Sequence, residues 1–156
     1  MAGRIKVRLK RDGLNVETSA LLNSVFETVS PDIVIPVELA KRLGLWPPEK
    51  SVSTLLDTGG GEVVLPFYKS ALELILEDRE NKNLLVNVIV NPHISEVLIS
   101  DYVASFLGIV LLDFKRGLWR LIDDPPNIVR RVILLKNGNL LSNMYLLGIS
   151  NCCFFK

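Results

Sequence analysis

One tripeptide in the sequence has residue types that could do hydrolytic chemistry. Asp57-Thr58-Gly59 follows two leucines and occurs once in the chain. An aspartate carboxylate can take a proton from water, and two neighbouring carboxylates share one proton because both cannot stay charged. In such a pair one carboxylate acts on the water while the other polarises the carbonyl that is attacked. A single tripeptide would therefore need a second copy of the chain, related by a two-fold axis.

The same segment also has the composition of a hairpin tip. Gly59, Gly60 and Gly61 follow each other directly, and glycine accepts positive φ without steric cost. The sequence thus leaves two interpretations of Asp57 open, a catalytic carboxylate or a residue at the end of a hairpin.

Other reactive residue types lack partners at useful spacing. Cys152 and Cys153 are adjacent, which makes a disulfide between them strained, and His93 stands alone between Pro92 and Ile94. Asp123-Asp124 precedes two prolines, a pattern more typical of a solvated turn than of a cation site. We expect no metal site and no cofactor.

Composition sets broad limits on function. The chain has 156 residues, 49% of them hydrophobic, with 18 Lys+Arg against 17 Asp+Glu. This fits one compact domain and gives no global reason to expect nucleic acid as a partner. The charged start lacks the apolar core of a signal peptide, and no apolar run is long enough to span a membrane. We expect a cytoplasmic protein without a membrane segment.

Hydrophobic periodicity predicts mostly strands. Apolar residues alternate with basic ones over 4–10, which indicates a half-buried strand before a turn at 11–13. Pro36 and Gly44 bound a short helix, and a second helix begins near Ser100 or Asp101. The predicted strands are 4–10, 14–22, 33–35, 52–56, 62–76, 84–90, 109–114, 118–122, 132–135 and 140–147, and the segment 96–106 begins as a strand and passes into the second helix.

The order of these segments over roughly residues 4–122 resembles that of retroviral-type (retropepsin-like) aspartic proteases. The similar motifs are Ala20-Leu21-Leu22, Ile33-Val34-Ile35-Pro36, Leu39-Ala40-Lys41-Arg42-Leu43-Gly44-Leu45, Leu98-Ile99-Ser100-Asp101-Tyr102 and the closing hairpin 107–119. The resemblance implies a mainly β, closed barrel-like acid-protease fold with two short helices. We predict a retropepsin-like domain at 1–124 and a hydrophobic C-terminal extension at 125–156.

This resemblance places Asn23-Ser24-Val25 where the family has its catalytic tripeptide, and puts Gly59, Gly60 and Gly61 in the flap. Asn23 replaces the catalytic aspartate, while Ser24 keeps the hydroxyl that braces the paired loops. Val25 and Ser100 replace two glycines of the family pattern. An amide has no pKa near neutrality with which to accept a proton from water. The chain resembles a stand-alone archaeal or bacterial-type member with a degenerate active-site loop.

Three functional hypotheses follow. The first is a non-catalytic homodimer, a pseudoenzyme whose groove binds an extended peptide or protein segment. The alternative is an active dimeric aspartic peptidase that uses Asp57-Thr58-Gly59. A third, without a positive motif, is a nucleic-acid accessory or toxin–antitoxin-like role through the basic strand 4–10. The extension at 125–156 would pair across the dimer interface or form a disordered or partner-bound tail.

Overall fold

The computed structural model describes residues 3–49, 51–58, 61–132 and 144–147. They pack as two units: Arg4–Leu107 forms the first, and the described residues from Gly108 onward, with Gly3, form the second. The domain division predicted at residue 124 falls inside the second unit and stays a prediction.

The first unit is a closed six-stranded β-barrel. Its strands follow each other in the order β1-β2-β7-β3-β6-β5, and pairing of β1 with β5 closes the ring. The strand bounds are β1 Arg4–Arg11, β2 Leu14–Leu22, β3 Asp32–Pro36, β4 Val52–Thr58, β5 Gly61–Leu76, β6 Asn83–Asn91 and β7 Val97–Ile99. The predicted mainly β, closed barrel with two short helices is confirmed.

The barrel closes because β1 alternates as its sequence predicts. Ile5, Val7 and Leu9 are buried inside, with basic residues between them on the outer face. Val7 and Leu9 lie opposite buried leucines at positions 76 and 74 of β5. Apolar pairs between β1 and β5, two strands distant in sequence, thus help to fill the barrel.

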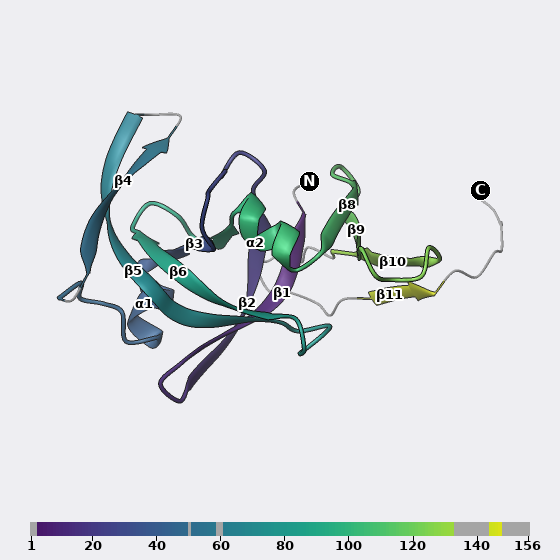
Figure 1. The fold of residues 1–156 in the computed structure, drawn as a ribbon, viewed down its shortest axis with the longest axis horizontal. Coiled ribbons are helices and arrows are strands. Elements are labelled where there is room, and N and C mark those ends of the chain that lie inside the picture. Colours follow the sequence, from purple (N-terminus) through teal and green to yellow (C-terminus); the bar gives the residue numbers. More distant parts are fainter. Residues whose placement is uncertain (1–2, 50, 59–60, 133–143, 148–156) are drawn as a thin grey trace, which may run out of the picture. The chain divides into compact units, whose positions relative to one another are not determined.

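A hairpin projects from this barrel. β4 pairs with the first half of β5 from Val52↔Phe67 to Thr58↔Gly61, whereas β5 meets β6 from Phe67 onward. Residues 61–66 of β5 therefore have β4 as their partner among the described strands. Figure 1 shows this hairpin extending away from the remaining strands. The outer edge of β4 is an edge of the sheet.

The two helices are short. In α1 (Val37–Arg42), Pro36 stands at the N-cap, and the chain reverses at Gly44, whose φ is +66°. In α2 (Asp101–Phe106), the hydroxyl of Ser100 accepts a hydrogen bond from the Val103 N–H at 3.4 Å. Across the described residues, no helix is long and apolar enough to cross a membrane.

The second unit is a four-stranded sheet in the order β11-β10-β9-β8. Its strands are β8 Ile109–Asp113, β9 Leu118–Leu121, β10 Ile128–Arg131 and β11 Met144–Leu147. The sequence did not predict β10, whose residues 130 and 131 pair with β9. Of the strand predicted at 132–135, Val132 lies just past the end of β10. The rest of that prediction falls in 133–143, outside the described residues. Cys152 and Cys153 also lie outside the described residues.

A buried ion pair organises this second unit. Arg130 and Asp124 are 3% and 5% exposed, and both guanidinium Nη atoms donate to the Asp124 carboxylate. The same carboxylate accepts the Leu121 N–H at 2.7 Å, and the guanidinium lies 5.1 Å from the ring centroid of the buried Trp119. Polar groups therefore fix the ends of β9 and β10.

Candidate functional site

The loop after β2 holds the three residues predicted to replace a catalytic tripeptide. The Asn23 N–H donates to the Ile99 carbonyl at 3.2 Å, which ties the start of the loop to β7. The Asn23 side-chain oxygen accepts the Val25 N–H at 3.1 Å, and the Asn23 backbone carbonyl accepts the Phe26 N–H at 3.1 Å. Asparagine favours such local turns. Ser24 and Val25 are exposed at the tip of this turn.

Asp101, at the start of α2, holds the far side of this loop. Its backbone N–H donates to the Phe26 carbonyl at 3.1 Å, and its Oδ1 accepts the Thr28 N–H at 2.9 Å. The same oxygen accepts the Tyr102 N–H at 2.7 Å. The loop at 23–29 is therefore fastened at both ends to the β7–α2 segment, and its central side chains are left uncovered.

A buried carboxylate that sequence reasoning missed lies beneath this loop. Asp32 is 9% exposed, and its two oxygens accept hydrogen bonds from Ser30 Oγ at 2.8 Å and Asn87 Nδ2 at 2.7 Å. Asn87 in turn accepts the Ser70 N–H at 2.8 Å. The available signal was a polar residue in each of two apolar strands, Asp32 beside 33–35 and Asn87 within 84–90.

The structure places Asp57 on the projecting hairpin. Asp57 is exposed near the end of β4, opposite Glu62 of β5, and the hairpin register continues to Thr58↔Gly61. Gly61 has φ of +116°, which a residue with a side chain rarely adopts. Gly59 and Gly60 lie outside the described residues. Asp57 therefore occupies a paired strand that extends beyond the barrel, not the loop that follows a barrel strand.

A groove of about 960 Å³ separates the loop at 23–29 from the β4–β5 hairpin. Val25 and Asp57 line the same groove, whereas Asn23 and Ser24 belong to the loop but are not lining residues. Its lining residues are Val25, Phe26, Glu27, Thr28, Val29, Asp32, Thr54, Leu55, Leu56, Asp57, Phe67, Ile89 and Asp101. Among these residues, Ile89 belongs to a buried hydrophobic cluster with Val34 and Leu65, and Phe26, Leu56 and Phe67 pack against that cluster. The groove therefore combines apolar side chains with exposed residues of the loop and the hairpin.

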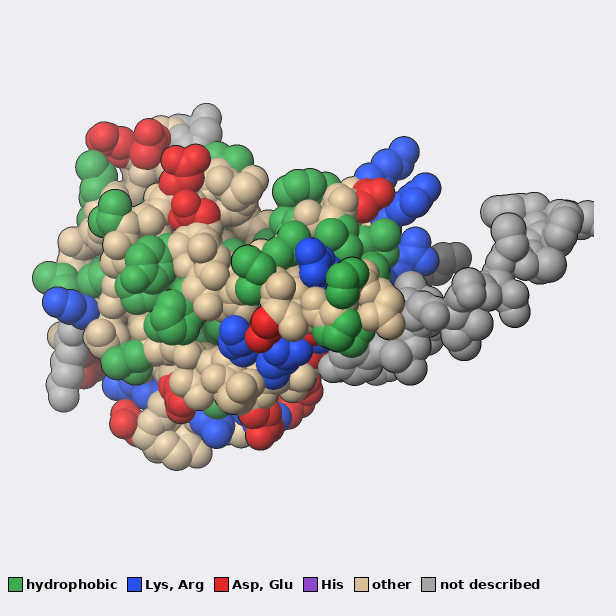
Figure 2. All heavy atoms as spheres, turned by 45° about the vertical axis from the view of Figure 1, so that its right-hand side comes forward, with side chains coloured by type: hydrophobic (Ala, Val, Ile, Leu, Met, Phe, Trp, Pro, Cys, Tyr) green, Lys and Arg blue, Asp and Glu red, His purple; other side chains and the backbone are tan. Residues whose placement is uncertain are grey.

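The titratable lining residues of this groove are all acidic. Glu27, Asp32, Asp57 and Asp101 contribute carboxylates, and the lining includes no Lys, Arg or His among the described residues. Figure 2 shows acidic side chains gathered at the upper left, near the end of the hairpin, without basic side chains among them. The groove is a region of unbalanced negative charge.

Most basic side chains on the outer face of β1, in contrast, are paired with neighbouring carboxylates. Arg4 pairs with Glu96 at 2.7 Å, and Arg8 pairs with Glu80 at 3.0 Å. Lys6 is 3.8 Å from a carboxylate oxygen of Glu77. The hydrogen bond with Glu96 raises the pKa of the Arg4 guanidinium above its ordinary value. Of the four basic residues in the stripe that suggested a nucleic-acid role, all but Lys10 therefore have a carboxylate within 4 Å among the described residues.

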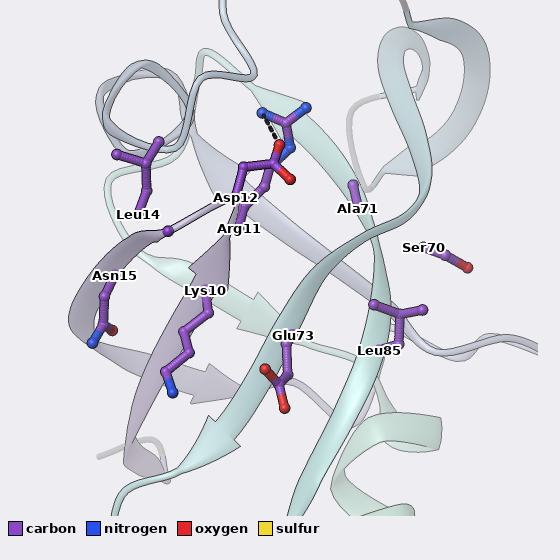
Figure 3. Close-up of a pocket in the computed structure, with 10 residues that line it drawn as sticks. Lys10, Arg11, Asp12, Leu14, Asn15, Ser70, Ala71, Glu73 and Leu85 are labelled. Atoms are coloured by element: carbon purple, nitrogen blue, oxygen red, sulfur yellow. Dashed lines mark ion pairs between the residues drawn. The ribbon is translucent and has the colours of Figure 1, made fainter.

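A second cavity, of about 610 Å³, lies beside the β1–β2 turn and the irregular part of β5 (Figure 3). Arg11 lines it and pairs with Asp12 at 3.6 Å, while its guanidinium also donates to the Leu43 and Gly44 carbonyls at 3.1 Å. Arg11 thus serves the end of α1. Within the described ranges, no cluster of three or more His, Cys, Asp or Glu could hold a metal ion.

Comparison with known proteins adds no further assignment. No family model matches the chain, and no curated protein matches its sequence.

Proposed function

We propose that the first unit provides a retropepsin-like groove that binds an extended peptide segment without cleaving it, in a homodimer. The observation that carries this proposal is the groove between the loop at 23–29 and the β4–β5 hairpin. Its walls come from the two chain segments that the resemblance assigns to the active-site loop and the flap. An asparagine begins the loop where hydrolysis would need a carboxylate.

The hydrogen bonds of Asn23 support a binding role. Its side-chain oxygen accepts the Val25 N–H within the loop. A neutral amide cannot remove a proton from water. With an amide at position 23, the paired loops of a dimer would therefore lack the base that activates water.

The free edge of β4 supports an extended ligand. Main-chain N–H and C=O groups along such an edge can pair with an added strand, which gives affinity independent of ligand sequence. Leu55 and Leu56 of β4 line the same groove as Phe26 of the loop, so both walls contribute apolar side chains. Apolar side chains of an added strand would be buried there.

Exposed valines on the loop support pairing of two chains. Val25 and Val29 are 86% and 98% exposed although both are aliphatic and line the groove. In a dimer with a two-fold axis, the loop of each copy would cover the loop of the other copy. Each groove would then continue into the groove of the other copy.

We expect the unmodified chain to leave peptides intact at acid and neutral pH. The double variant Asn23→Asp with Val25→Gly should bind a transition-state inhibitor of aspartic peptidases. The two carboxylates introduced at position 23, one from each copy, would share one proton and hold the inhibitor hydroxyl. Calorimetric titration should give one inhibitor per two chains, because each dyad needs both copies.

Asp57→Asn in the unmodified chain is the matched control. Acid peptidase activity that disappears in Asp57→Asn would establish the alternative, an active enzyme using Asp57, and would overturn the proposal. Inhibitor binding by the double variant at one per chain would contradict the dimer.

A further inference from the structure

Two of the groove carboxylates lack a basic partner among the described residues, whereas several carboxylates elsewhere on the barrel have one. Glu77, Glu80 and Glu96 each meet a basic side chain of β1 within 4 Å. Glu27 and Asp57 are exposed and form no ion pair within the part of the chain that the structure describes. Two exposed carboxylates of the groove, Glu27 and Asp57, are therefore available to a basic ligand.

The remaining two carboxylates have partial roles in the fold. Each oxygen of the buried Asp32 accepts one hydrogen bond, from Ser30 and from Asn87, so this carboxylate has a role in the fold. Asp101 uses one oxygen, Oδ1, for two backbone N–H groups. Its other oxygen accepts no hydrogen bond from any described residue. The loop side of the groove therefore carries acceptors from Glu27 and Asp101, and the hairpin side carries Asp57.

Apolar surface lies alongside these charges. Leu55, Leu56, Phe26, Phe67 and Ile89 line the groove together with the carboxylates. Side chains of an extended segment alternate between two faces, at about 3.3 Å per residue. An occupant that turns aliphatic residues toward this apolar lining can therefore turn their neighbours outward, toward the exposed carboxylates.

We propose that the groove takes an extended segment in which aliphatic residues alternate with Lys or Arg. This inference rests on the proposed function and names its ligand class. Basic side chains would meet Glu27, Asp57 and the free oxygen of Asp101, while the aliphatic ones cover the leucines and phenylalanines. A segment with acidic side chains would meet like charges at both walls.

Three short peptides with blocked termini and a neutral fluorophore test this proposal: alternating Val-Lys, Val-Gln and Val-Glu. Fluorescence anisotropy with the full chain at low salt should show Val-Lys binding about tenfold more tightly than Val-Gln, with Val-Glu weakest. Raising the salt concentration should reduce this preference, since the charges at the rim are open to solvent.

Glu27→Gln with Asp57→Asn should weaken Val-Lys binding by about fivefold and leave Val-Gln binding unchanged. Glu38→Gln with Glu80→Gln removes the same charge from exposed positions outside the groove and serves as the matched control. Equal affinity for Val-Lys and Val-Gln would overturn the basic preference and keep the peptide-binding function. No binding of any of the three peptides would overturn both.

Discussion

Replacing Arg130 by Met is expected to lower the free energy of unfolding of the second unit by about 3–5 kcal/mol. The Asp124 side chain is fully buried, so the variant leaves a carboxylate inside the protein without its guanidinium partner. That carboxylate also accepts the Leu121 N–H, so the loss of stability includes the end of β9. Urea unfolding followed by Trp119 fluorescence in a Trp46→Phe background measures the change, because Trp119 lies under Arg130.

Asp124→Leu combined with Arg130→Met is the matched control. Removing both charges eliminates the unpaired ion, so the double variant should recover a large part of the stability lost in the single one. A single variant within about 1 kcal/mol of the unmodified chain would show that the ion pair does not hold this unit.

Replacing Asp32 by Ala is expected to lower the free energy of unfolding of the barrel by about 2–4 kcal/mol. The change leaves Ser30 Oγ and Asn87 Nδ2 without their acceptor in a buried position. Asn87 also fixes the Ser70 N–H, where β5 changes register and φ is +46°. Chemical denaturation of the Asp32→Ala variant, with Trp46 retained and its fluorescence as the signal, measures the effect.

Asp32→Asn should lose less stability than Asp32→Ala, because its amide keeps one oxygen for Asn87. Glu27→Ala, at an exposed position of the same groove, should stay within about 0.5 kcal/mol of the unmodified chain. If Asp32→Ala proved as stable as Glu27→Ala, the hydrogen-bonded carboxylate would have no structural role beneath the loop.

Elements bounded by strong local signals could be predicted from the sequence. The alternation of β1, the turn at Asp12-Gly13 and the return of β2 depend on neighbouring residues, and their bounds agree with the structure. Pro36 and Gly44 likewise mark the ends of α1 through their own φ preferences. The sequence predicts a cap near Ser100 or Asp101, and Ser100 caps α2.

Features that depend on distant contacts could not be predicted in the same way. Asp32 and Asn87 are 55 residues apart, and nothing local to either indicates that they meet. The four groove carboxylates come from four separate segments, so their shared charge exists only after folding. In the second unit, β10 has two arginines at its end, and its pairing with β9 rather than a local pattern makes it a strand.

Hydrogen exchange of the backbone amides, measured by mass spectrometry with and without the Val-Lys peptide, tests the central claim most directly. The account predicts slower exchange along β4 and in the loop at 23–29, because an added strand pairs with the free edge and covers the loop. The peptide should be recovered intact. Cleaved peptide, or protection confined to residues outside these two segments, would contradict a non-catalytic peptide-binding groove.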